Sequence, residues 1–130
     1  MKLSQMMTFK SVVCLFIGLV FVLIPGFLLT YFGVPNSEPS GMFYMARLYG
    51  ATFLLLGLLL WLGRNLAEAD ARRVIVPAVF VGDALGFLVV LGGQLGGMMN
   101  ALGWSVVLLY LLLTVGFGYF LLAKPTAQTN

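Results

Sequence analysis

The sequence predicts an all-α integral membrane protein, an antiparallel four-helix transmembrane bundle with both termini in the cytoplasm. Three observations predict this fold. First, 62% of the 130 residues are hydrophobic and 8% are charged, whereas a soluble domain carries about 25% charged residues. Second, four apolar runs each reach the length of about 20 residues that a bilayer core requires. Third, six of the seven basic residues fall on one side of these runs, which is the positive-inside pattern.

The charge asymmetry predicts the orientation. The basic residues on the inner side are Lys2, Lys10, Arg64, Arg72, Arg73 and Lys124. The two outer connections carry one charge between them, Glu38. The net charge of +3 is small and dispersed, so it does not predict nucleic-acid binding. Topology and attraction to anionic lipid headgroups account for it.

The first two spans form the first predicted hairpin. The first covers about residues 11–32 and runs outward, with a kink at Pro25 because proline removes a backbone hydrogen bond. An outer connection rich in turn-forming residues, 33–41, follows it. The second span returns inward over about residues 42–62.

The last two spans form the second hairpin. The inner connection, 64–73, contains Glu68 four residues before Arg72, a spacing that favours a helical turn. The third span covers about residues 74–95, and a very short connection makes the fourth, at about 101–123, its antiparallel neighbour. The polar tail beyond it is expected to be mobile. Residues 1–130 are therefore predicted to form a single four-span domain.

Two ionisable side chains are predicted within the spans, Arg47 and Asp83. Each costs about 2.5–3.5 kcal/mol at the centre of a membrane helix, and such residues usually face other helices. Helical spacing places Arg47 on one face with Gly50 and Gly57, and Asp83 on one face with Gly86. Small residues mark close helix–helix contact in membranes, so both charges are expected to face protein.

Glycines also predict packing contacts in the third span. Gly82 and Gly86 form a GxxxG pair, which is typical of packing between helices. Contact within the chain is the preferred interpretation, and a homodimer seam is the alternative.

The partners of the two charged residues are left open by the sequence. Arg47 lies about five residues from the outer end of its span and Asp83 near the middle of its own, so their heights differ by about 8 Å. A direct salt bridge is one arrangement. In others Gln94 lies near Arg47, Tyr110 lies near Asp83, or a protonated Asp83 donates a hydrogen bond. Asp83 is either a structural clamp between helices or a proton or cation site. Arg47 either extends its charge to the lipid headgroups or has a functional role.

Residue types that commonly carry catalysis are scarce. The chain has no histidine and one cysteine, Cys14, which is interpreted as a small buried hydrophobic residue. No catalytic residue, cofactor site or metal site is predicted, and the protein is not expected to be an enzyme.

Part of the chain resembles a known group of proteins. The segments PGFLLTYFGVP, residues 25–35, and ARLYGATFLLLGLLLWLGR, residues 46–64, resemble uncharacterised bacterial four-span proteins that are DoxX-like in size. In these a proline ends the first span and an Arg-x-x-Gly element, here Arg47 and Gly50, begins the second. The resemblance implies a small bundle in the bacterial cytoplasmic (inner) membrane and no particular activity.

Three functions follow as hypotheses. The leading one is a non-catalytic accessory or scaffold subunit that packs against other integral membrane proteins or lipids, or forms a homo-oligomer. The first alternative is a dimeric small transporter or channel with Asp83 as its coupling site. The second is a pocket for a lipid- or quinone-like ligand beside Arg47, at the kink of the first span.

Overall fold

The computed structural model describes residues 2–35 and 39–123, and within these ranges the chain is helical with no strand. The helices are α1 (Leu3–Leu23), α2 (Pro25–Tyr31), α3 (Pro39–Gly63), α4 (Glu68–Leu95) and α5 (Gly103–Leu122). All but α2 are long and apolar enough to cross a membrane, which confirms the prediction of a multi-pass helical membrane protein. The charge predicted in the outer connection, Glu38, and the polar tail from Lys124 lie outside the described residues.

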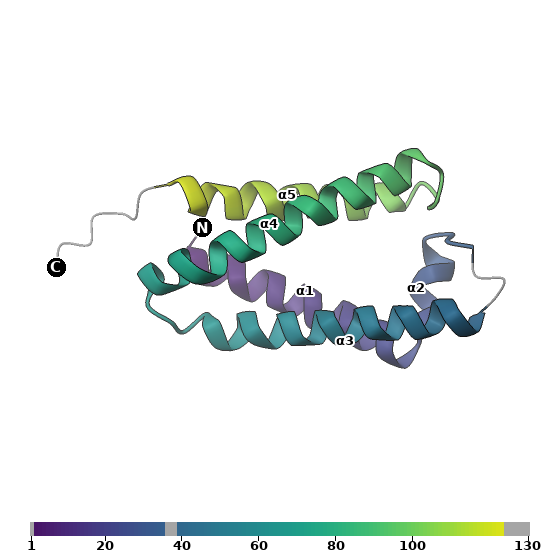
Figure 1. Cartoon of the computed structure of the whole chain (residues 1–130), viewed down its shortest axis with the longest axis horizontal. Helices are drawn as coiled ribbons and strands as arrows, with labels where there is room; N and C mark the ends of the chain where they lie inside the picture. The colour runs from purple at the N-terminus through teal and green to yellow at the C-terminus, as the bar shows by residue number, and fades with distance from the viewer. Residues whose placement is uncertain (1, 36–38, 124–130) are drawn as a thin grey trace.

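The long helices are arranged as two pairs. α1 packs along α3, α4 packs along α5, and the short α2 contacts both α1 and α3. Figure 1 shows the two pairs as two layers in which successive long helices run in opposite directions. The start of α1, the connection between α3 and α4, and the end of α5 lie at the same end of the molecule (Figure 1), which we call the basic end.

The first span begins earlier than the charge pattern predicts. α1 starts at Leu3 and ends at Leu23, and Pro25 then begins α2 as a separate helix. The backbone departs from helical geometry at Ile24, with φ −137° and ψ 68°, because proline cannot continue the hydrogen-bond ladder of the preceding helix. The predicted interruption at Pro25 is therefore a break between two helices.

The predicted position of Lys10 ahead of the first span is wrong. Lys10 lies within α1 and is buried. The sequence places this charge before the apolar run, but the turns that precede Lys10 bury Leu3, Met6 and Met7 and belong to the same helix. Without Lys10, Lys2 and Arg64 remain outside the long helices, and Arg72 and Arg73 lie in the first two turns of α4, so the charge asymmetry that predicts the orientation persists.

The inner connection is also shorter than predicted. α4 begins at Glu68 and includes Arg72 and Arg73. An oxygen of Glu68 lies 2.8 Å from Arg72 Nη2, so the spacing of four residues forms the expected pair. Arg72 Nη1 also donates to the backbone oxygens of Phe120 and Ala123, at 3.2 and 2.9 Å, which ties the start of α4 to the end of α5.

Glycines allow α1 and α3 to approach closely. A Cβ atom placed on Gly50 would lie 2.8 Å from the backbone oxygen of Gly18, and one on Gly57 would lie 2.7 Å from Leu15. Ser11 Oγ donates to the backbone oxygen of Gly57 at 2.7 Å. The two helices are therefore in near backbone contact, and a polar bond fixes their register.

The four long helices share a hydrophobic core at the basic end. Its buried members are Leu3, Met6, Met7, Leu60, Ala71, Val76, Val79, Leu113, Phe117 and Phe120. At the opposite end, the Asn100 backbone N–H donates to the Phe32 oxygen at 2.8 Å, and its side-chain amide donates to the Tyr31 oxygen at 3.0 Å. The two pairs are thus joined at both ends, and the candidate site lies between these contacts.

Candidate functional site

A buried ion pair joins the two helix pairs. Lys10 Nζ of α1 donates to Asp83 Oδ1 of α4, across 73 residues of sequence. Lys10 is 4% exposed and Asp83 is 3% exposed. Each isolated charge is costly inside a membrane protein, and pairing offsets part of that cost. The pair therefore explains how both side chains are accommodated within the spans.

The second carboxylate oxygen of Asp83 has no partner. Asp83 Oδ2 is buried and makes no hydrogen bond within the part of the chain that the structure describes. An ionised carboxylate accepts hydrogen bonds at both oxygens, and an unsatisfied buried acceptor is costly. Asp83 thus keeps one acceptor that no described residue satisfies.

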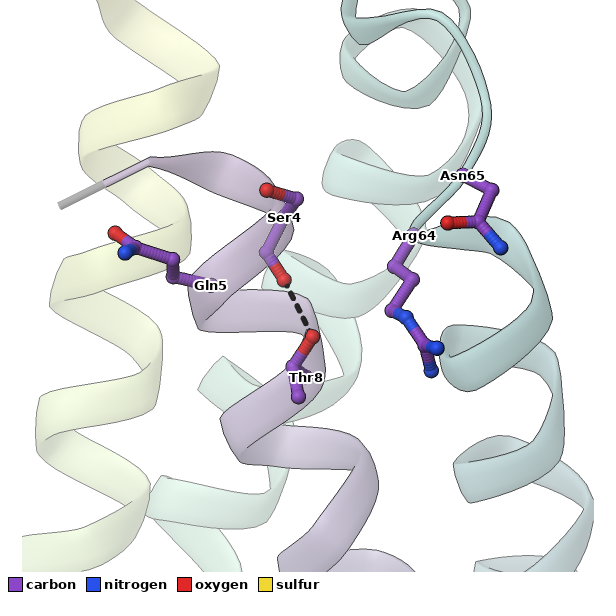
Figure 2. Close-up of a pocket in the computed structure, with 5 residues that line it drawn as sticks. All are labelled: Ser4, Gln5, Thr8, Arg64 and Asn65. Atoms are coloured by element: carbon purple, nitrogen blue, oxygen red, sulfur yellow. Dashed lines mark hydrogen bonds between the residues drawn. The ribbon is translucent and has the colours of Figure 1, made fainter.

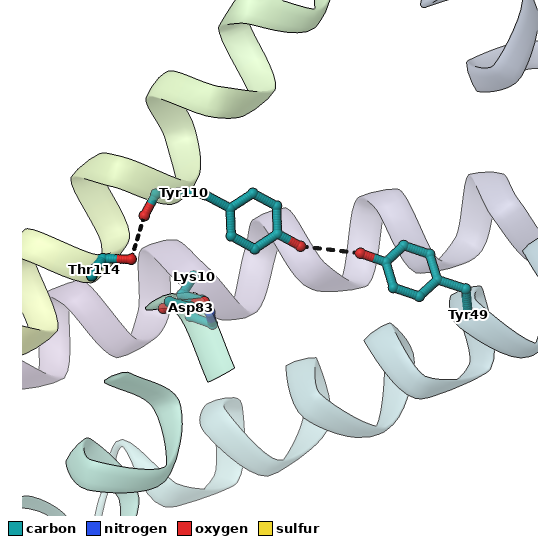
Figure 3. A network of polar contacts seen from close by, with 5 residues as sticks. All are labelled: Lys10, Tyr49, Asp83, Tyr110 and Thr114. Atoms are coloured by element: carbon teal, nitrogen blue, oxygen red, sulfur yellow. Dashed lines mark hydrogen bonds and ion pairs between the residues drawn. The ribbon is translucent and has the colours of Figure 1, made fainter. Parts of the chain in front are cut away.

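Two tyrosines form a second link between the helix pairs. The hydroxyl oxygens of Tyr49 on α3 and Tyr110 on α5 lie 3.0 Å apart. The Tyr110 ring packs on Gly86, one turn after Asp83 on α4, where a Cβ atom would collide with it. Figure 3 shows the tyrosines meeting end to end beside the ion pair. We call Lys10, Asp83, Tyr49 and Tyr110 the intramembrane polar cluster.

Two cavities adjoin this cluster. The first, of about 580 Å³, extends between α3 and α4 to Leu66 and Val74 and is called the basic-end cavity. The second, of about 510 Å³, extends from the cluster to Val34 and Met99 at the opposite end and is called the far cavity. Lys10, Tyr49 and Tyr110 line both cavities, and Asp83 lines the basic-end cavity. The cluster therefore forms a polar wall shared by two largely apolar cavities.

This arrangement suits the binding of a small molecule. Ligand pockets are typically about 300–1,000 Å³, mostly apolar, with a few polar groups that set orientation. Apart from the cluster, the basic-end cavity is lined by Thr52, Phe53, Leu56, Leu59, Leu66, Val74, Ile75, Ala78, Val79 and Gly82. Among the described residues, no group of three or more histidine, cysteine or acidic side chains is placed to hold a metal ion.

Arg47 lies outside the cluster. Its side chain is exposed, and its Nε donates to the backbone oxygen of Val22 at 3.2 Å. Val22 is in the last turn of α1, where backbone oxygens lack helical partners, so Arg47 caps this helix end. Asp83 is paired with Lys10, and the salt bridge between Arg47 and Asp83 that the sequence left open does not form.

The other predicted polar residues are separated from one another. Gln94 is buried and donates to the Asn100 backbone oxygen at 3.1 Å, at the turn between α4 and α5. Tyr110 pairs with Tyr49, a residue that sequence reasoning did not select. Gln94 therefore supports the turn, and Tyr110 belongs to the cluster.

The predicted packing glycines differ in their surroundings. Gly50 and Gly57 lie against α1, and Gly86 lies against Tyr110. The prediction that Gly82 packs within the chain on the same face as Gly86 is wrong, because no heavy atom lies within 4 Å of a Cβ built on Gly82. Gly82 instead lines the basic-end cavity.

No protein-family model, curated protein or solved structure matches this chain. The likeness to DoxX-like proteins therefore stays a prediction. Any functional conclusion depends on the geometry of the cluster and its cavities.

Proposed function

We propose that this protein binds a small apolar molecule carrying a hydroxyl group, held in the basic-end cavity beside Lys10 and Asp83. In this proposal it is a non-catalytic four-helix bundle of the bacterial inner membrane, with both termini cytoplasmic. Lys2 and Arg64 outside the long helices, and Arg72 and Arg73 in the first two turns of α4, support that orientation. The start of α1, the connection between α3 and α4, and the end of α5 share one end of the molecule (Figure 1), as the orientation requires.

The free oxygen of Asp83 carries the proposal. Asp83 Oδ2 is buried without a partner, and Asp83 lines a cavity of about 580 Å³. A hydroxyl group supplies the missing donor, and an aliphatic or aromatic body suits the apolar lining. A phenol, a quinol or a hydroxylated lipid meets both requirements. A quinone has only acceptor oxygens and leaves Asp83 Oδ2 unsatisfied.

The ion pair itself also supports a role beyond stability. A buried pair contributes little net stability compared with apolar residues of the same volume, because desolvation opposes the attraction. Membrane-embedded charges commonly mark ligand or ion pathways. Lys10 and Asp83 occupy positions that apolar side chains would fill at lower cost, which favours a binding role.

Transport is the second candidate, because the cavities extend in opposite directions. The basic-end cavity reaches Leu66, the far cavity reaches Val34, and the polar cluster separates them. A ligand that passes this wall crosses the membrane, with Asp83 as the coupling group. Asp83→Asn is then expected to abolish flux of the identified ligand in proteoliposomes while the protein still folds. Unchanged flux in this variant would contradict a role for Asp83 as the coupling group of transport.

The binding proposal predicts an apolar hydroxylated compound in the purified protein. Extraction of protein isolated in mild detergent from its own host, followed by mass spectrometry, should find about one such molecule per chain. Gly82→Phe fills open space in the basic-end cavity, so this variant should lose the compound.

Gly92→Phe is the matched control, since Gly92 is also on α4, has open space and lines neither cavity. This variant should retain the compound. Equal retention by both variants, or no compound in the wild-type protein, contradicts binding in this cavity. Recovery of all three proteins in a stoichiometric complex with a larger membrane protein, without such a compound, favours the accessory role instead.

A further inference from the structure

A separate polar cavity lies at the basic end. It has a volume of about 390 Å³ and is lined by Ser4, Gln5, Thr8, Arg64 and Asn65. Figure 2 shows Arg64 and Asn65, which follow α3, on one side and the three residues of α1 on the other. Every lining side chain can form hydrogen bonds, and none is acidic. One cation and no carboxylate in the lining favour an anion over a cation.

Arg64, which lines this cavity, has an unused donor. Its Nη1 atom is buried and has no hydrogen-bond partner in the described part of the chain. The guanidinium lies 3.4 Å from the centroid of the Trp61 ring. Stacking on an aromatic ring holds the guanidinium plane while its edge stays available for hydrogen bonding. Arg64 is therefore positioned as a donor that still requires an acceptor.

The carboxylates that the structure describes are already paired with other cations. Asp83 pairs with Lys10, Glu68 with Arg72 and Asp70 with Arg73. Arg64 forms no ion pair with any of these three carboxylates. The Arg64 guanidinium is therefore available to an anion other than these three carboxylates.

The position of Arg64 at the end of a membrane helix indicates which kind of anion can reach it. Arg64 follows the last residue of α3, and tryptophan and arginine prefer the headgroup region at the ends of membrane helices. Arginine recognises phosphate through parallel N–H donors. We propose that this cavity binds a phosphate group through Arg64, with Ser4 and Asn65 as additional hydrogen-bonding groups. An anionic phospholipid headgroup and free phosphate share this chemistry.

Native mass spectrometry of the detergent-solubilised full chain tests the site, with phosphatidylglycerol as the probe. The wild-type protein should retain one tightly bound lipid. Arg64→Gln should weaken its affinity about tenfold or more. Arg64→Lys keeps the charge but lacks the planar guanidinium, so its affinity for the lipid should lie between those of the wild type and Arg64→Gln. The midpoint temperature of thermal unfolding of each variant should be close to that of the wild type, since Arg64 is only partly buried.

Arg73→Gln is the matched control. It removes the same charge at the same end, but the Arg73 side chain is 79% exposed and lies outside the cavity, so affinity should change less than about twofold. Equal losses in Arg64→Gln and Arg73→Gln, or no tight lipid in the wild type, overturn the site.

Inorganic phosphate distinguishes the two sources of the phosphate group. Displacement of the lipid by millimolar phosphate, together with Arg64-dependent broadening of the phosphate signal in phosphorus NMR without lipid, assigns the site to the free anion. Retention of the lipid under these conditions assigns it to the headgroup. Both results support a phosphate site, provided that binding depends on Arg64.

Discussion

Lys10→Met should destabilise the protein by about 3–5 kcal/mol, because it leaves the buried carboxylate of Asp83 without its partner. The loss exceeds that of an ordinary surface change because both side chains are almost completely buried. The free energy of unfolding, measured by denaturant titration in detergent micelles, is the appropriate readout.

The double variant Lys10→Met/Asp83→Leu separates the loss of stability caused by an unpaired buried charge from the net contribution of the ion pair to the free energy of unfolding. Replacing both partners with apolar side chains removes the unpaired charge, so stability should return to within about 1 kcal/mol of the wild type or above it. Lys2→Met, at an exposed position outside α1, should change stability by less than about 0.5 kcal/mol. A double variant as unstable as Lys10→Met would show that the loss of stability does not come from the unpaired charge of Asp83.

Gly50→Leu should disrupt the contact between α1 and α3 and destabilise the protein by about 3 kcal/mol or more. A Cβ atom at this position would lie 2.8 Å from the Gly18 backbone oxygen and 2.8 Å from Phe21 Cβ. Neither atom can move away without shifting a helix, and overpacking of this kind commonly costs about 1–3 kcal/mol even where side chains yield. The same unfolding titration measures the effect.

Gly92→Leu provides the comparison for Gly50→Leu. Gly92 is also a helical glycine, but nothing lies within 4 Å of a Cβ built there. This substitution should be neutral or slightly stabilising, because leucine favours helix more than glycine does. Similar losses in both variants would indicate that helix propensity or membrane insertion, rather than the contact with α1, controls stability.

The pattern of hydrophobic residues and charges was sufficient to predict the helical membrane class and the four spans. It also selected Gly50 and Gly57, which face α1, because helical spacing alone decides which residues share a face. Residue spacing likewise selected Asp83 as a buried residue. These features are local, so a single sequence contains them.

The partner of Asp83 was not predictable in the same way. Lys10 follows a polar start to the chain, and the sequence predicts a topology signal there, since nothing local distinguishes a buried lysine from an interfacial one. Its role depends on contact with Asp83, 73 residues away. The pairing of Tyr49 with Tyr110, 61 residues apart, depends equally on how the two helix pairs pack. The polar cluster is therefore a product of tertiary structure.

The most direct test of the binding proposal compares two ligands that differ in one hydrogen-bond donor. Equilibrium binding of a long-chain alkylphenol and of its methyl ether should be measured on the wild-type protein in detergent. We expect the phenol to bind about tenfold more tightly than the ether, because only the phenol can donate to the free oxygen of Asp83. Equal affinities would contradict recognition of a hydroxyl group by Asp83.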